Sequence, residues 1–311
     1  MSVVQSANSS ATLMSQVGPN IISHVSNTYK TNYLPVYKIE PIMGIDFSVT
    51  KHVFMLWLVA FIVSVSIIIP IRFFIKSKAL IPTGWVNTLE AIVQFIRDSI
   101  VKPNVGEKWV MVWTPLILTF FFFILFSNAI GMIPIFDVLG LINRFILDVP
   151  YSDSHNFING LLHGGVTATG NFNVTGGLAT VTFFAIIIAG SKAHGFIKHW
   201  KNLVPHGLAW PVYIILIPIE IMGLFVKPFA LTMRLAANMT GGHIALLALL
   251  SLMAIFGEMF HSAAVGIGVA FVSVPMAAAI AGLEIIVVLV QAYVFTLLTS
   301  VFIGMAIHVH H

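Results

Sequence analysis

The C-terminal third of the chain is almost continuously apolar. Apolar sequence extends over about residues 207–256 and again over 262–307, and the break between them is the short segment 257–261. As a helix, each run would be about 70 Å long, more than twice the roughly 30 Å of a bilayer's hydrocarbon core. Each run therefore holds either two membrane spans or one very long, strongly tilted helix. Neither run has a polar turn near its middle, which favours two long helices forming a hairpin.

Composition extends this conclusion to the whole chain. Only 8% of the 311 residues are Asp, Glu, Lys or Arg, and 58% are hydrophobic, whereas an ordinary soluble domain carries roughly 25% charged residues. So few charges cannot cover the surface of a soluble domain, which indicates an all-α integral membrane protein. The net charge of +4 agrees with the basic bias of cytoplasmic membrane loops, so no nucleic-acid partner is expected. The absence of cysteine excludes disulfides, thiolate metal sites and cysteine nucleophiles.

Three shorter apolar runs precede the two long ones, so we expect five membrane-embedded helices in all. Basic clusters at one end of these runs and acidic segments at the other give a consistent orientation, with the basic loops cytoplasmic. The polar arm 1–50 then lies outside, and so does the loop 137–175; both belong to the acidic or polar side. The membrane domain is 51–311, with spans of about 53–71, 109–134, 174–191, 207–256 and 262–307.

One further segment has the pattern of an amphipathic helix. Over about 82–101, apolar residues recur at helical spacing and polar residues occupy the opposite side. This pattern is typical of a helix that lies along the membrane interface, and the turn-forming residues 82–84 begin it. The apolar side consists of Trp85, Leu89, Ile92, Val93, Ile96 and Ile100.

Ionisable residues inside the long apolar runs are functional candidates, because a charge at the bilayer centre costs several kcal/mol. Glu220, Lys227 and Arg234 are spaced by seven and share one helical stripe. Asn238 follows one turn beyond Arg234. Glu220 and Lys227 could instead be structural: they could form ion pairs, or their side chains could extend to the lipid headgroups. Arg234 stays protonated in essentially any protein site, and no acidic residue lies within a turn of it, so its counter-charge is expected from another protein.

The last run carries a matching pair. Glu284 and Gln291 are seven apart and share a helical face. Antiparallel packing of the two long helices would bring Glu284 towards His243 and Gln291 towards Arg234, although the spacing leaves the register open. The adjacent glycines at 241 and 242 allow a neighbouring helix to approach closely.

These residues resemble the motifs of one known family, subunit a of the F-type ATP synthases. The resemblance rests on PFALTMRLAANMTGGH at 228–243, on the last run with GLE at 282–284 and QAYVFT at 291–296, and on NAIGMIP at 128–134. It covers about residues 45–305. Two local departures stand out: Gly131 replaces an acidic residue found in some bacterial members, and the loop 137–175 is longer than in compact members.

The resemblance implies a stationary subunit beside a rotating ring of c subunits, with b-type peripheral stalk subunits and the rest of the complex as partners. Arg234 would be the essential charge that faces the ring carboxylate. Glu284, His243, Asn238, Gln291 and Glu220 would belong to the proton path, with Lys227 and Asn128 in support. The histidine and the glutamate stand in the exchanged order that other members also show. The expected location is the bacterial inner membrane, with the mitochondrial inner membrane as the alternative.

The expected function is proton conduction through two offset half-channels that meet the ring from opposite sides, with sodium as the less favoured ion. No Walker loop or other nucleotide-hydrolysis motif is present in the sequence. We therefore expect a non-catalytic subunit that does not hydrolyse ATP itself and has no cofactor and no metal. The competing class is a self-contained proton- or sodium-coupled transporter or channel. Such a protein often contains inverted repeats, and the sequence has no internal repeat.

Overall fold

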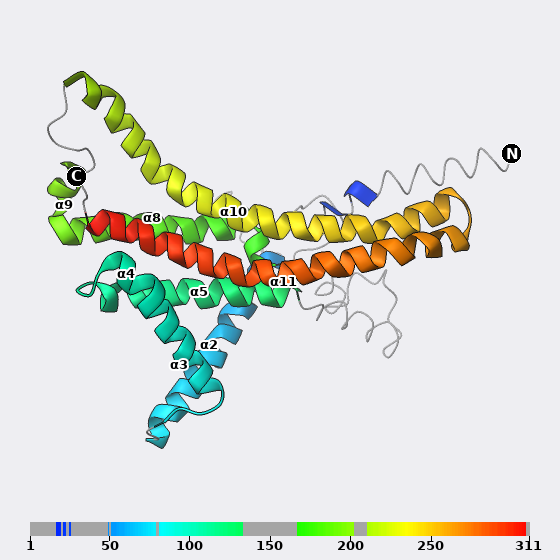
Figure 1. The fold of residues 1–311 in the computed structure, drawn as a ribbon, viewed down its shortest axis with the longest axis horizontal. Helices are drawn as coiled ribbons and strands as arrows, with labels where there is room; N and C mark the ends of the chain where they lie inside the picture. The colour runs from blue at the N-terminus through cyan, green and yellow to red at the C-terminus, as the bar shows by residue number, and fades with distance from the viewer. Residues whose placement is uncertain are drawn as a thin grey trace. The chain divides into compact units, whose positions relative to one another are not determined.

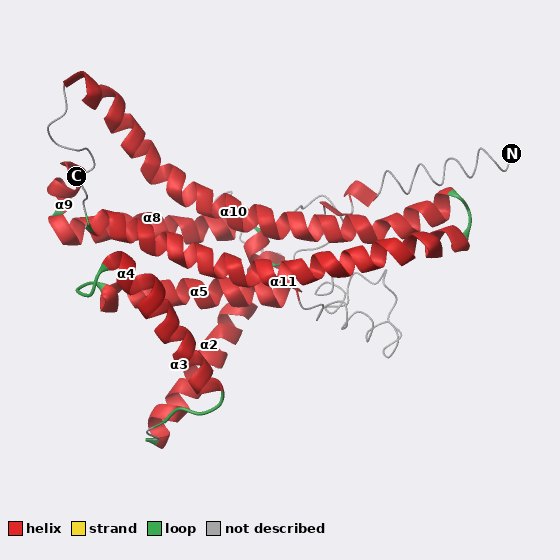
Figure 2. Cartoon of the chain, in the orientation of Figure 1, coloured by secondary structure: helices red, strands yellow, loops and turns green. Residues whose placement is uncertain are grey.

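The computed structural model describes residues 17–19, 21–22, 25, 49, 51–78, 81–132, 167–201 and 210–308. Every element within these ranges is a helix (Figure 2), which confirms the expected all-α class. Most of the arm 1–50 lies outside the described residues, and so does the loop 137–175 up to residue 166.

Five of the helices are long and apolar enough to cross a membrane. Both long apolar runs form single helices, α10 of 50 residues and α11 of 45 residues, as expected; their tilt in the membrane remains a prediction. The helices are α2 (Lys51–Ser77), α5 (Val110–Met132), α8 (Phe172–His194), α10 (Trp210–Met259) and α11 (Ala263–Ile307) (Figure 1).

The break between the two long helices is a tight C-terminal cap. The amide of Ser262 donates to the carbonyl of Gly257, and the amide of His261 donates to the carbonyl of Glu258, both at 3.0 Å. His261 has a φ of +46°. This pair of bonds around a left-handed residue is a Schellman motif, which satisfies the last carbonyls of a helix and reverses the chain. The polar segment 257–261 therefore ends α10, and three residues separate its last residue from the first residue of α11.

The amphipathic segment is longer than expected. It begins with α3 (Trp85–Phe95) after Gly84, whose φ is +59°, and continues through one wide π-helical turn, η1 (Ile96–Val101), into α4 (Lys102–Val105). Leu89, Ile96 and Ile100 of the expected apolar side are buried. Trp85 is half exposed, and its indole Nε1 donates to the carbonyl of Ser66 in α2 at 3.0 Å.

The chain divides into two compact units, and α2, α5, α10 and α11 each contribute to both. The hairpin unit comprises Met1–Trp57, Ser127–Asn171 and Ala237–Val288. In it, the second half of α10 runs antiparallel to the first part of α11, and a Cβ atom added at Gly257 would lie 3.4 Å from the Cα of Gly266. The bundle unit comprises Leu58–Phe126, Phe172–Ala236 and Leu289–His311.

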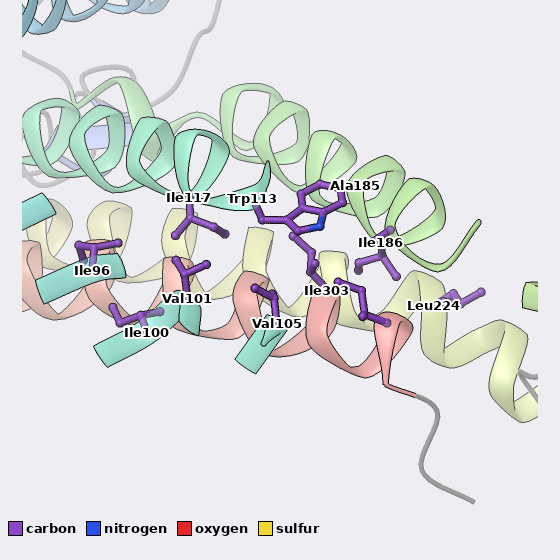
Figure 3. Close-up of a cluster of buried hydrophobic side chains, with 12 residues drawn as sticks. Ile96, Ile100, Val101, Val105, Trp113, Ile117, Ala185, Ile186, Leu224 and Ile303 are labelled. Atoms are coloured by element: carbon purple, nitrogen blue, oxygen red, sulfur yellow. The ribbon is translucent and has the colours of Figure 1, made fainter. Parts of the chain in front are cut away.

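The core of the bundle unit gathers side chains from six elements. Trp113 and Ile117 of α5, Ile186 of α8, Leu224 of α10 and Ile303 of α11 all converge with residues of η1 and α4 (Figure 3). Burial of such side chains contributes roughly 1.5–3 kcal/mol each relative to exposure in water. The same apolar atoms are equally soluble in lipid, so close packing and not water exclusion holds helices together inside a membrane.

A second cluster of the bundle unit fixes the rotation of α10. Leu231 and Leu235 are buried against Phe120, Ala292 and Phe295, and the rings of Phe120 and Phe295 meet edge to face with centroids 5.5 Å apart. Two residues four apart occupy the same face of a helix, so this face of α10 packs on α5 and α11. The neighbouring Arg234 consequently lies on the exposed side of α10.

Candidate ion-translocation site

Arg234 lies at the middle of α10, with 24 residues of the helix before it and 25 after it. Its side chain is exposed, as are those of its neighbours Phe229 and Met233. Within the described part of the chain, no carboxylate oxygen lies within 4.0 Å of Arg234. The guanidinium is thus a fixed charge beside exposed apolar side chains, and the described residues supply it with no carboxylate there.

Gln291 holds the backbone beside this charge. Its amide Nε2 donates to the main-chain carbonyl of Arg234 at 3.1 Å, and its side chain is only 5% exposed. The expected approach of Gln291 to Arg234 is therefore present, but through the backbone and not through the guanidinium. A donor to an intrahelical carbonyl fixes the register of α10 against α11 at this level and leaves the guanidinium free to meet another group.

The other members of the seven-residue stripe have different surroundings. The ammonium of Lys227 lies 5.7 Å from the centre of the Phe302 ring, within the range of a cation–π contact. Glu220 is partly exposed, and neither it nor Lys227 forms an ion pair with another described residue. The structure therefore does not pair Glu220 with Lys227 or Arg234.

In the hairpin unit, α10 and α11 bring His243 and Glu284 together, as the antiparallel arrangement predicts. His243 Nδ1 lies 3.7 Å from Glu284 Oε1, and the two side chains are 18% and 11% exposed. This distance is too long for a hydrogen bond but suits an electrostatic contact with a protonated imidazole. Neither atom has a hydrogen-bond partner among the described residues. A small side-chain movement would bring the two atoms within the distance that proton transfer needs.

Gly242 makes room for this carboxylate. A Cβ atom at position 242 would overlap Oε1 of Glu284 and would lie 2.9 Å from its Cδ. The neighbouring Gly241 has nothing within 4 Å of the equivalent point. Of the two glycines expected to allow close helix packing, Gly242 is therefore the one that does so.

A second polar group of the hairpin unit joins the end of α5 to α10. Asn128 is fully buried, and its side-chain oxygen accepts a hydrogen bond from the hydroxyl of Thr169. Thr169 belongs to the short 3₁₀ turn η2 (Ala168–Gly170). The hydroxyl of Thr240 in α10 donates to the carbonyl of Gly170 in the same turn at 3.2 Å.

The sequence did not single out these two threonines. Thr169 falls in a segment that reads as external loop, and no local pattern marks it. Thr240 did carry a usable signal, because it stands three residues before His243 and so shares its helical face. Asn238, by contrast, is exposed, and its side chain forms no hydrogen bond with another described residue. No group of three potential metal ligands occurs among the residues that the structure describes.

Comparison with known proteins identifies the family. The family model described as "ATP synthase A chain" matches residues 53–304. The chain is 39% identical over 297 residues to ATP synthase subunit a 2 of Chlorobium luteolum, covering 94% of this chain and 76% of that protein. It is 40% identical over 273 residues to ATP synthase subunit a of Pelodictyon phaeoclathratiforme, covering 86% and 68%.

A third relative is longer than this chain. The chain is 39% identical over 270 residues to ATP synthase subunit a of Anaeromyxobacter dehalogenans, covering 86% of this chain but only 60% of that protein. The family match covers the whole set of candidate residues from Asn128 to Gln291. On these matches, the chain belongs to the ATP synthase A chain family.

Proposed function

We propose that this chain is the proton-conducting stator subunit of a rotary ATP synthase, with Arg234 facing a carboxylate on the c-ring. The observation that best supports this proposal is the position of Arg234. It is a permanent charge at the middle of a 50-residue apolar helix, on the exposed side, with no carboxylate within 4.0 Å among the described residues. A charge so placed is costly in lipid, and a carboxylate on a neighbouring protein would offset that cost.

Family membership supplies the setting. The chain is a membrane-sector subunit of a rotary ATP synthase and a multi-pass protein of the bacterial inner membrane, and the remainder of the complex is its partner. Its functions of ATP synthesis and ion transport follow from the family. The c-ring and the b-type stalk subunits, as the particular neighbours, belong to the proposal.

The proposed mechanism depends on two charges, the guanidinium of Arg234 and a carboxylate on the ring. A fixed guanidinium stabilises the ionised form of an arriving carboxylate, so that the carboxylate releases its proton to one half-channel. The same charge repels protons and prevents direct leakage between the half-channels. A membrane potential delivers about 2.3 kcal/mol per charge per 100 mV. Because the half-channels are offset, a proton completes its transit only when the ring rotates.

We assign Glu284 and His243 to one half-channel. Histidine and glutamate together can relay protons near neutral pH, and a small side-chain movement would shorten their 3.7 Å separation to hydrogen-bonding distance. Gln291 would hold the backbone of Arg234 in register, and Asn238 would hydrate the ring-facing side. Glu220 would serve the entrance on the cytoplasmic side, with Lys227 and Asn128 in support.

Replacement of Arg234 tests the proposal directly. In membranes containing the assembled complex, Arg234→Ala is expected to abolish proton-driven ATP synthesis, while the amount of the subunit in the membrane stays normal. Arg97→Ala is the matched control, because Arg97 is a surface arginine paired with Asp98 at 2.8 Å, outside the five spans, and it should retain synthesis. Synthesis at the wild-type rate in the Arg234→Ala membranes would refute the assignment.

A further inference from the structure

The short helix α9 (Phe196–Lys201), which follows α8, presents apolar side chains that the described residues leave uncovered (Figure 1). Phe196, Ile197 and Trp200 are 64%, 72% and 41% exposed, and the rings of Phe196 and Trp200 meet edge to face with centroids 6.4 Å apart. The apolar span that precedes them ends at His194. The three side chains therefore lie just beyond the end of a span, where exposure of so much apolar surface to water would be unfavourable.

Two glycines determine how α9 is placed on α8. Gly195 has a φ of +87°, a left-handed conformation that turns the chain between the two helices. A Cβ atom at Gly190 of α8 would overlap the ring of His199, and His199 is buried, so α9 packs on α8 through this histidine. Ile197 stands two residues before His199, which is about 200° around the helix. The apolar surface of α9 therefore faces away from α8.

The same stretch of chain is strongly basic. Lys192 in the last turn of α8 and Lys198 in α9 are exposed, and Lys201 is the last residue of α9. The sequence contains no Asp or Glu between Asp153 and Glu220. Among the described residues, no carboxylate oxygen lies within 4.0 Å of either exposed lysine. The positive charge at this end of α8 is therefore available to an anion from outside the described part of the chain.

Exposed aromatic and aliphatic side chains next to lysines are typical of helices that lie in the membrane interface. The apolar side chains enter the boundary between headgroups and acyl chains, and the ammonium groups remain at the level of the phosphates. Any lipid could cover the apolar side chains, but the lysines favour a headgroup with a net negative charge. Basic loops are expected on the cytoplasmic side, and the cytoplasmic leaflet carries acidic lipids. The position of α9 at the end of a span favours such a lipid over a soluble acidic protein.

We propose that α9 and the last turn of α8 form a binding surface for acidic phospholipid headgroups, with Lys192 and Lys198 against the lipid phosphates and Ile197 in the acyl boundary. The inference does not depend on the residues assigned to proton conduction. It also gives the surface a structural consequence, because His194 Nε2 lies 2.9 Å from the carbonyl of Ile307 in α11. A lipid held at the last turn of α8 would therefore stabilise the contact between the ends of α8 and α11.

Fluorescence quenching of a probe on α9 tests the preference for acidic lipid. The chain has no native cysteine, so Ile197→Cys in the assembled complex can carry a bimane label, and the identically treated wild-type complex gives the background. The labelled complex is placed in phosphatidylcholine liposomes that contain either spin-labelled phosphatidylglycerol or spin-labelled phosphatidylcholine. Phosphatidylglycerol is expected to quench with an apparent affinity about tenfold or more above that of phosphatidylcholine, because each lysine near an anionic surface strengthens binding by about fivefold.

Lysine variants in the Ile197→Cys background assign the preference to particular side chains. Lys192→Gln and Lys198→Gln should each lower the preference for phosphatidylglycerol by about fivefold, and Lys198→Arg, which keeps the charge, should retain it. Lys76→Gln is the matched control. Lys76 is an exposed lysine in the last turn of α2, and that end of α2 lies well apart from α9 (Figure 1), so this variant should quench as the parent does.

Each alternative occupant of this surface gives a different result. Equal quenching by the two lipids would mean an ordinary bilayer contact and would overturn the proposal. Quenching by neither lipid would mean that another subunit covers α9, which also overturns it. Raising the salt concentration from about 0.05 M to about 0.5 M should weaken the preference, because salt screens the lysine charges. This salt series needs only the Ile197→Cys complex, so it decides the question if a glutamine variant fails to assemble: a preference that salt does not change refutes the assignment to the lysines.

Discussion

The charged residues of α10 and α11 differ in whether the described part of this chain provides them with a polar partner. Glu284 is buried beside His243, so its environment is built by this protein. Arg234 is exposed, and among the described residues its one side-chain contact of this kind is the Gln291 amide, which bonds to the Arg234 carbonyl. The difference explains why the two residues are assigned different tasks. A buried acid next to an imidazole can exchange protons within the chain, whereas an exposed guanidinium acts on a group that arrives from outside.

The two adjacent glycines allow a sharp test of the Glu284 environment. Gly242→Ala places a methyl group where Oε1 of Glu284 lies, so the carboxylate must turn away from His243. We expect proton uptake by vesicles containing the complex to fall by about tenfold or more, since a relay depends on distances near 3 Å. Gly241→Ala is the control, because nothing lies within 4 Å of its added methyl group. Equal uptake in both variants would contradict the geometry assigned to Glu284.

Among the elements, the segment from α3 to α4 follows one face of the last turns of α11. The rings of Phe95 and Tyr293 stack with centroids 6.3 Å apart, and the hydroxyl of Ser300 donates to the carbonyl of Ile100 at 3.3 Å. Further contacts follow at Gly304 and at His308, whose Nε2 lies 3.2 Å from the carbonyl of Val105. The π-helical turn η1 (Ile96–Val101) stands within this contact. A π-helical turn shifts the helical register, and here it leaves the Ile100 carbonyl available to Ser300.

Replacing two glycines of α11 with alanine should change the stability of the protein in opposite directions. A Cβ at Gly304 would overlap the backbone of Asn104, with its carbonyl carbon only 2.8 Å away. Gly304→Ala should therefore push α4 from α11 and destabilise the protein by about 1–3 kcal/mol. Gly268→Ala meets nothing within 4 Å and should stabilise helix α11 by up to about 1 kcal/mol. Thermal unfolding of the two variants in detergent measures both effects, and a stabilised Gly304→Ala would contradict the packing.

The junction of α8 with α9 (Phe196–Lys201) should be sensitive to pH. His199 is 4% exposed and its ring lies against Gly190. Burial lowers the pKa of His199 below its ordinary 6.5, and the nearby His194 lowers it further. The unfolded chain therefore binds a proton more readily than the folded one. Its contribution to stability is complete above pH 6.5 and is lost as the pH falls towards the folded-state pKa.

Thermal unfolding in detergent between about pH 7.5 and about pH 5.5 tests this. The wild type should lose more stability on acidification than His199→Gln, which cannot take up the proton. His261→Asn serves as the control, because His261 is exposed in the turn after α10 with a φ of +46°, a conformation that Asn also tolerates. An identical pH dependence of the wild type and His199→Gln would contradict the role of burial.

For the whole molecule, the distribution of charge implies dependence on partners. The described ion pairs Arg97–Asp98 and Lys102–Glu107 lie outside the five spans, and exposed side chains on the long helices are largely apolar. Lipid tails can cover those apolar side chains, but they offer no counter-charge to Arg234. The proposed function therefore requires a second protein that supplies a carboxylate.

Reconstitution tests this dependence. The purified chain alone in liposomes is expected to give no coupled proton or sodium flux, whereas the intact complex should conduct protons under an imposed potential. The intact complex carrying Arg234→Ala controls for the contribution of the arginine itself. Coupled transport by the chain alone would favour the self-contained transporter and contradict the stator.

Most of the helices could be predicted from the sequence, because the formation of a membrane helix depends on local properties of the chain. Helix length and apolar content follow from consecutive residues, so the two long helices and their short connection could be expected from the runs around segment 257–261. The seven-residue spacing likewise placed Glu284 on one face with Gln291, and the antiparallel packing of the two long helices suggested His243 as a neighbour of Glu284. The amphipathic pattern located α3, but it could not show the π-helical turn or the extension to Val105, since those depend on packing against α11.

What the sequence alone determined is the set of helices and the rare charges that lipid would not tolerate. The tertiary structure decided which atoms those residues meet. Gln291 bonds to the carbonyl of Arg234, Glu284 fits over Gly242, and Thr169 joins Asn128 across 41 positions of sequence. The physical reason is that helical periodicity is repeated along one segment, whereas these contacts arise from the register and close approach of segments far apart in the chain.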